Sequence, residues 1–214
     1  WVTGFPAPII LALMLNELKN LRYKKVIQTI SYLPHFLSWV ILAGLFTQLL
    51  SPSNGAVNYI IEKLGGKPIY FLADNKYFRG TLVVTGIWKE IGWGTVVYLA
   101  TIAGIDQELY EAAECDGAKR WRKMWSITLP LMKPTIVMCL VYCVTGSILA
   151  FDQFFILTKG GPNNSTMTVV QLIYNFAFDS KKDLGMAAAL SLIVLVALVI
   201  INSIQMRGMR DNTK

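Results

Sequence analysis

Long apolar blocks separated by polar blocks dominate this chain. The five apolar blocks are residues 2–15, 33–50, 81–105, 135–157 and 185–204. The last four have about the length that a helix rising 1.5 Å per residue needs to cross a hydrocarbon layer of roughly 30 Å. Because backbone groups inside lipid must bond to one another, each crossing is expected to be helical. The pattern predicts an all-α polytopic integral membrane helix bundle with about five transmembrane helices.

The first apolar block is shorter than the other four. It has neither the basic region nor the cleavage site of a signal peptide. We therefore expect it to be part of a membrane helix that begins before Trp1.

Composition also indicates a membrane protein. The chain is 54% hydrophobic and 15% charged, whereas soluble domains carry about 25% charged residues. The net charge of +7 would suit a nucleic-acid-binding protein, but the basic residues lie between the apolar blocks, as they do in membrane proteins. We expect no nucleic-acid partner. The three cysteines form no CxxC pair, and Cys139 and Cys143 are expected to be packing residues on one helix face.

The basic residues are divided unevenly between alternate polar blocks. Twelve lie in residues 16–32, 106–134 and 206–214, and seven lie in residues 51–80 and 158–184. Cytoplasmic loops of membrane proteins carry the excess of Lys and Arg. The first set is therefore predicted to be cytoplasmic, with the N-terminus outside and the tail, residues 207–214, inside.

Turn residues delimit two short helices in the predicted outer blocks. Ser53-Asn54-Gly55 is expected to start the first helix and Gly65-Gly66 to end it. Gly160-Gly161-Pro162-Asn163 predicts a turn. Residues 168–178 are expected to form the second helix.

The polar segment 106–134 is long for a connection between two membrane helices. Asp106 is expected to cap a short helix that Asp116-Gly117 ends, because glycine readily adopts the left-handed conformation. A second helix is predicted from Ala118 to about Thr128. Leu129-Pro130 is expected to break that helix, and Pro134 is expected to open the next membrane helix.

A spaced motif runs through this segment. Glu111-Ala112-Ala113 is followed after three residues by Gly117, after nine more by Ile127, and after one more by Leu129-Pro130. The motif resembles the EAA loop of permease subunits of bacterial binding-protein-dependent ABC importers. Further matching pieces of sequence resemble the carbohydrate branch, which includes maltose-type permeases and lipoprotein-type polysaccharide permeases; they are Leu15-Asn16-Glu17, Tyr32-Leu33-Pro34, residues 98–104 and Gly160-Gly161-Pro162. Met124 departs from the phenylalanine of many relatives.

The resemblance implies a permease of the type I ABC importer kind, coupled to an ATPase through its cytoplasmic EAA loop. The coupling positions that it implies are Glu111, Ala112, Ala113, Asp116, Gly117, Leu129 and Pro130. From the residues alone, the segment could equally be a solvated loop of mixed charge. The resemblance further implies an ATPase subunit dimer, a second homologous permease subunit and an extracellular substrate-binding lipoprotein as partners, in the lipid bilayer of the bacterial cell membrane.

The chain has no GxxxxGK[ST] motif, so ATP is expected to be bound and hydrolysed by a partner subunit. The permease itself is expected to be non-catalytic and to need no cofactor. With one histidine and no HExxH motif, no metal site and no membrane enzyme is expected.

Charged residues within an apolar block suggest a substrate pathway. Trp88, Lys89 and Glu90 lie inside the block 81–105, and charges at membrane depth cost about 2.5–3.5 kcal/mol each on insertion scales. Adjacent helical residues point about 100° apart, so Lys89 and Glu90 are not expected to face one another. One of them is expected to face a cavity or the partner permease, unless the span begins later and both lie near the outer interface.

A second candidate lies near the outer end of the block 135–157. Asp152 and Gln153 beside Phe155 combine hydrogen-bonding groups with an aromatic face, as a sugar site requires. The alternative is an aromatic membrane anchor. His35 is expected to be structural.

The sequence thus favours an importer subunit for oligosaccharides or polysaccharide fragments. The alternatives are a permease of another ABC importer branch, for peptides, amino acids or ions, and a secondary transporter or channel. The latter would leave the EAA motif without a role.

Overall fold

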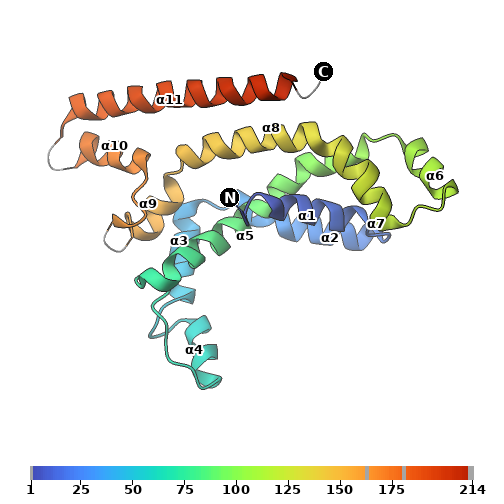
Figure 1. Cartoon of the computed structure of the whole chain (residues 1–214). Helices are drawn as coiled ribbons and strands as arrows, with labels where there is room; N and C mark the ends of the chain where they lie inside the picture. The colour runs from blue at the N-terminus through green and yellow to red at the C-terminus, as the bar shows by residue number, and fades with distance from the viewer. Residues whose placement is uncertain (1, 162–163, 180–181, 212–214) are drawn as a thin grey trace. The chain divides into compact units, whose positions relative to one another are not determined.

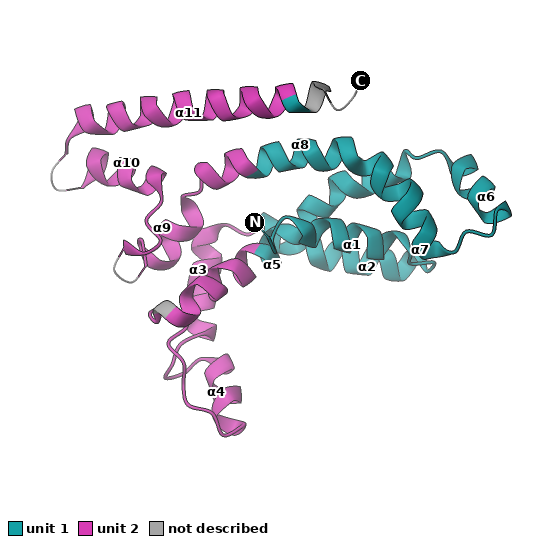
Figure 2. Ribbon diagram, viewed as in Figure 1, with its two compact units in different colours: residues 1–36, 87–143, 208–214 teal, residues 37–86, 144–207 magenta. Residues whose placement is uncertain are grey.

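The computed structural model describes residues 2–161, 164–179 and 182–211, and every regular element within these ranges is a helix (Figure 1). The predicted all-α class is therefore confirmed. The chain divides into two compact units (Figure 2). Unit 1 comprises residues 1–36, 87–143 and 208–214, and unit 2 comprises residues 37–86 and 144–207.

Unit 1 is built around the second part of the long helix α5. Its elements are α1 (Pro6–Asn16), α2 (Leu21–Tyr32), the 3₁₀ turn η1 (Leu33–Phe36), the later part of α5 (Asn75–Ala103), α6 (Gln107–Cys115), α7 (Arg120–Lys123), the π-helical segment η2 (Met124–Thr128) and most of α8 (Leu129–Ile148). Ala12, Tyr98, Ile102 and Met132 form its buried core, and Cys139 packs against them. The helices α1, α5 and α8 thus share one apolar core.

Unit 2 holds the first part of α5 and the shorter helices. Its other elements are α3 (Trp39–Leu49), α4 (Ala56–Lys63), the end of α8, α9 (Asp152–Thr158), α10 (Val169–Phe178) and most of α11 (Leu184–Asp211). Ala43, Phe78, Leu82 and Leu157 form its buried core. This core joins α3, α5 and α9.

The short helices begin and end at the residues that the turn chemistry predicts. Gly55 is the N-cap of α4, and the Gly66 N–H closes its end on the Ile61 carbonyl at 2.9 Å. The Thr168 hydroxyl accepts from the Gln171 N–H at 3.2 Å to cap α10. Gly160 and Gly161 have positive φ, in agreement with a turn, while Pro162 and Asn163 lie outside the described residues.

Two predicted apolar blocks are not single helices. Block 33–50 contains η1 and then α3, because Ser38 starts a new helix by accepting from the Ile41 N–H at 3.4 Å. Block 135–157 contains the end of α8 and then α9, with a non-helical Phe151 between them. The tail predicted at residues 207–214 does not begin where the last helix ends, because α11 continues to Asp211. Residues 212–214 lie outside the described residues.

Length and composition identify two membrane-spanning candidates among the described residues. They are residues 120–148 and 184–208, and a third follows if the interrupted pair 21–36 and 39–49 is one span. The helix α1 has 11 residues, and α5 carries Lys89 and Glu90 in its middle. The five predicted crossings therefore stay predictions.

Candidate functional sites: the EAA segment and two polar clusters

The EAA segment (residues 106–134) begins with a helix whose two ends are closed as predicted. The Asp106 carboxylate accepts from the Glu108 N–H at 3.0 Å. At the other end Gly117 adopts φ +75°, and the Ala118 N–H donates to the Ala113 carbonyl at 2.9 Å. This is the left-handed glycine closure that many helices use.

The motif residues of α6 lie at the surface. No residue of α6 is buried. Glu111, Ala112, Asp116 and Gly117 are exposed, and Ala113 is half-buried. Within unit 1, α6 lies at one end, beyond α7 (Figure 2). The small side chains and the carboxylate are therefore accessible to another protein.

Side-chain contacts fix α6 to the helices that follow it. The Tyr110 hydroxyl and the Thr128 hydroxyl are hydrogen-bonded at 2.9 Å. The Lys123 ammonium donates to the Glu114 carboxylate. This hydrogen bond, with the charges of Lys123 and Arg120, holds the pKa of Glu114 below its ordinary value. A displacement of α6 would thus be passed to η2 and α7.

The second half of the EAA segment corrects the prediction. The helix expected to stop at Leu129-Pro130 instead continues, since α7, η2 and α8 follow one another without a gap. The Leu129 N–H donates to the Met124 carbonyl, five residues back. Pro130 has no N–H, and the wider π turns before it let the helix pass. Pro134 accordingly lies inside α8 rather than at its first position.

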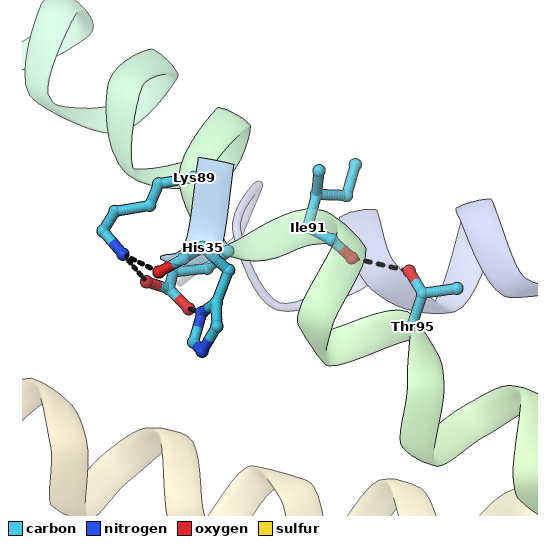
Figure 3. Close-up of polar contacts among 5 residues, drawn as sticks. His35, Lys89, Ile91 and Thr95 are labelled. Carbon is cyan, nitrogen blue, oxygen red and sulfur yellow. Dashed lines mark hydrogen bonds and ion pairs between the residues drawn. The ribbon is translucent and has the colours of Figure 1, made fainter. Parts of the chain in front are cut away.

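Lys89 lies beside His35 in a polar cluster of unit 1 (Figure 3), and Glu90 contacts both residues. The Lys89 ammonium lies 2.8 Å from the His35 carbonyl oxygen and 3.3 Å from the Glu90 carboxylate. The other Glu90 oxygen lies 2.8 Å from the His35 ring nitrogen Nδ1. The expectation that Lys89 and Glu90 cannot meet is therefore wrong, because both long side chains turn toward His35. Trp88, on the same helix, is 43% exposed.

Gln153 and Phe155 take different roles in unit 2, while Asp152 is exposed. The Gln153 side-chain amide donates to the Leu82 carbonyl at 2.8 Å, which fixes α9 on α5. Phe155 stacks on Phe151 with ring centroids 4.9 Å apart.

Tyr174 and Phe178 extend this stack into a four-ring aromatic array across α9 and α10. The Tyr174 ring lies 4.9 Å from Phe155, and Phe178 lies 5.1 Å from Tyr174. Phe178 is 69% exposed. The sequence analysis missed Tyr174, although it lies four residues before Phe178 on a helix that was predicted, so their shared face could have been noticed.

Among the described residues, no group of three or more His, Cys, Asp and Glu side chains could hold a metal ion.

Comparison with known proteins places these features in a family. Residues 4–207 match the model of the "binding-protein-dependent transport system inner membrane component" family. The chain is 46% identical over 157 residues to protein LplB of Bacillus subtilis (strain 168), covering 73% of this chain and 49% of LplB. It is 45% identical over 154 residues to the polygalacturonan/rhamnogalacturonan transport system permease protein YteP of the same organism, covering 72% and 48%.

A solved structure has the same fold. In the crystal structure of the bacterial alginate ABC transporter in complex with an alginate pentasaccharide-bound periplasmic protein, one chain superposes with a TM-score of 0.94 and 37% identity, covering 100% of this chain and 74% of that one. The chain spans about half the length of the curated relatives LplB and YteP. The match to the family model over nearly all residues confirms the resemblance, and the chain belongs to the binding-protein-dependent transport system inner membrane components.

Proposed function

We propose that this protein is a non-catalytic transmembrane subunit of an ATP-driven importer of oligosaccharides or polysaccharide fragments. It docks through the EAA segment on a separate ATPase subunit dimer and pairs with a second, homologous permease subunit. An extracellular substrate-binding lipoprotein delivers the substrate.

One observation carries this proposal: the exposure of the motif on a helix that is closed at both ends. Glu111 and Ala112 are exposed on α6, and Gly117 closes the helix in a conformation that suits glycine. A loop that merely joined two membrane helices would not need this arrangement. The small side chains of Ala112 and Ala113, with the exposed Glu111 carboxylate beside them, suit insertion into a groove of a partner that offers Arg or Lys.

The contacts of α6 suggest how movement reaches the membrane helices. ATP-driven closure of the ATPase dimer displaces α6, and the contacts Tyr110–Thr128 and Glu114–Lys123 pass the displacement to η2 and α7. Because η2 runs directly into α8, α8 moves with it. Such movements open the pathway alternately to the two sides.

The topology follows the distribution of basic residues. In this proposal the segments 2–15, 33–50, 81–105, 135–157 and 185–204 cross the bacterial cell membrane. The EAA segment and the C-terminus then lie in the cytoplasm, and the N-terminus lies outside.

The oligosaccharide assignment has two supports. The names of relatives refer to polysaccharides, namely polygalacturonan for YteP and alginate for the superposed transporter. The aromatic array of unit 2 also presents partly exposed ring faces, on which pyranose rings can stack. Trp88, Glu90, Asp152 and Phe155 are the proposed pathway residues. Lys89, whose side chain is 7% exposed, and Gln153 contribute by holding η1 and α9 in place.

Co-purification tests the proposal. The intact protein is solubilised from membranes together with co-expressed partner permease and ATPase subunits. The native protein is expected to retain the ATPase, and Glu111→Lys is expected to reduce the retained amount at least ten-fold, since loss of one partner of a buried interfacial charge pair costs about 2–5 kcal/mol.

Glu62→Lys is the matched control, because Glu62 is also an exposed glutamate on a short helix, α4. It should leave ATPase retention unchanged. If no ATPase is retained by the native protein, or if both variants behave alike, the EAA segment is a solvated loop. An ATPase-independent transporter or channel would then be the better assignment.

A further inference from the structure

The interruption between α2 and α3 leaves backbone groups that need partners. The η1 turn ends at Phe36, and the next helix begins at Trp39. The last carbonyl groups of a helical stretch have no partner within it. Inside an apolar layer each such group needs a partner from elsewhere in the protein.

Lys89 provides that partner for one of these carbonyl groups. Its side chain is only 7% exposed, and its ammonium lies 2.8 Å from the His35 carbonyl oxygen. A buried ammonium is costly unless it is paired, and Glu90 supplies the opposite charge at 3.3 Å. Lys89 thus has a structural reason to bind the end of η1.

The His35 ring is held by the same part of α5. Its Nδ1 lies 2.8 Å from the Glu90 carboxylate, and its ring stacks on Trp93 with centroids 4.7 Å apart and planes 4° apart. His35 is therefore fixed through both its backbone and its ring by residues of one helix. We call the group of His35, Lys89, Glu90 and Trp93 the corner clamp; Figure 3 shows His35 beside Lys89.

The backbones also approach closely here. A Cβ atom at Gly92 would lie 2.0 Å from the Ser31 carbonyl oxygen. Only glycine allows the end of α2 to lie this close to α5. One turn further, the Thr95 hydroxyl donates to the Ile91 carbonyl at 2.6 Å (Figure 3). The same hydroxyl lies 3.3 Å from the Pro8 carbonyl.

The position of the corner clamp in the chain points to its role. The chain leaves unit 1 after Phe36 and returns to it at Ile87. The clamp joins these two places within unit 1, and α5 continues from it to Ala103, just before the cap of α6 at Asp106. We propose that the corner clamp makes the α2–η1 corner move as one body with α5 and the EAA segment. His35, Lys89 and Glu90 are then positioning residues for coupling, an inference that rests on the proposed function.

A distance measurement under turnover conditions tests this inference. Spin labels are placed on α2 and α6, at the exposed positions Arg22 and Glu108, in a variant with serine at Cys115, Cys139 and Cys143. The labelled protein is assembled with the co-expressed partner permease and ATPase. The distance between the labels is recorded without nucleotide and after trapping with ATP and vanadate.

The protein with the native clamp residues should give one narrow distance between the two labels, both without nucleotide and in the trapped state. In Lys89→Met and in Glu90→Ala, a second distance should appear in the trapped state. The ratio of molecules at the second distance to molecules at the first should be about five-fold higher than in the native protein, as expected for a coupling network of ordinary strength. Lys89→Arg should behave like the native protein because it keeps the donor to the His35 carbonyl.

Substitutions of His35 test the corner clamp independently, because they change no residue of α5. His35→Asn keeps a donor near the position of Nδ1 and should preserve the single distance, whereas His35→Ala should not. The matched control is the exposed pair on α4: Glu62→Ala and Lys63→Met should leave the single distance unchanged.

The inference is overturned if the Lys89→Met and Glu90→Ala variants keep the single label distance. It is also overturned if the protein with the native clamp residues already shows two label distances. Failure of the proposed function gives a different result: no ATPase associates and no vanadate-trapped state forms with the native protein, which removes the basis of both proposals.

Discussion

Gly117 shows how one residue determines the shape of the EAA segment. Its φ of +75° is in the left-handed region, whereas a Cβ atom there would meet nothing within 4 Å. The backbone conformation, and not crowding, therefore selects glycine at this position. An L-residue in this conformation costs about 1–2 kcal/mol.

Gly117→Ala should accordingly lower the free energy of unfolding by about 1 kcal/mol, and Gly117→Asn should lower it less, because asparagine tolerates the left-handed region. Thermal unfolding of the purified protein in detergent measures both, with a decrease in Tm of about 2–4 °C expected for the alanine variant. Gly146→Ala is the control, since Gly146 lies inside α8 with open space around its Cβ position. Equal Tm values for the Gly117→Ala and Gly146→Ala variants would contradict this argument.

Glu114 makes the contact between α6 and α7 dependent on pH. Lys123, and to a lesser degree Arg120, lower the pKa of Glu114 in the folded protein. A lowered pKa means that the contribution to stability is complete above the ordinary value of about 4.5 and is lost as the pH falls below it through the folded pKa. Glu114 is 64% exposed, so solvent screens the effect.

The expected result is a loss of amide hydrogen-exchange protection in α6 between pH 5 and pH 3, after correction for the intrinsic exchange rate. Glu114→Gln should have the lower protection already at pH 7 and should show no further loss in that range. A native profile that matches the variant at every pH would show that the ion pair does not stabilise α6.

At the scale of elements, the segment around α4 is held together by one buried amide. The Asn58 side chain is 1% exposed. It donates to the carbonyls of Leu50, Ser51 and Ile69 at 3.0–3.2 Å and accepts from the Ile69 N–H at 2.8 Å. It therefore joins both ends of the loop that carries α4.

Asn58→Ala should remove the side-chain partner of the Ile69 N–H and of the Leu50 and Ile69 carbonyls, and each group left unsatisfied costs about 1–3 kcal/mol. The Ser51 carbonyl keeps the Gly55 N–H as a donor. We expect residues 50–70 to become sensitive to limited proteolysis in detergent while the rest of the protein stays resistant. Asn54→Ala, at an exposed position of the same loop, should leave the cleavage rate unchanged. Equal cleavage of both variants would rule out Asn58 as the fastening residue.

Helix ends were the most predictable part of the fold. Asp106, Gly117 and Gly55 all act where the sequence placed them, because capping depends on chemistry within a few residues. Local rules failed at Pro130, where a proline that should end a helix is accommodated by the π turns before it. The π segment has no local sequence signature that would have indicated it.

Contacts between distant residues could not be predicted from one sequence. His35 lies 55 positions from Glu90, and the aromatic array joins rings from α9 and α10 that only the fold brings together. Single-residue reasoning identified Lys89, Glu90 and Phe155 as unusual. It did not identify their partners, so it gave Lys89 and Glu90 the wrong geometry.

At the scale of the whole molecule, the apolar helices need surroundings that the chain itself does not provide. In the candidate spans 120–148 and 184–208, 11% and 6% of the most apolar stretch is buried within the protein. Large side chains such as Leu192, Val196 and Ile200 remain more than half exposed on α11. Lipid and neighbouring membrane helices are the surroundings that such surfaces require.

The central claim is that α6 is the contact site of an ATPase. Photo-crosslinking tests it most directly, with a benzophenone amino acid at the exposed position Ala112 of α6 and, as control, at Tyr59 of α4, which is 58% exposed. In membranes that contain the assembled importer, the probe at Ala112 is expected to crosslink to the ATPase subunit and the probe at Tyr59 is not. Absence of that product from an importer that hydrolyses ATP and takes up sugar would contradict the assignment of the EAA segment as its coupling site.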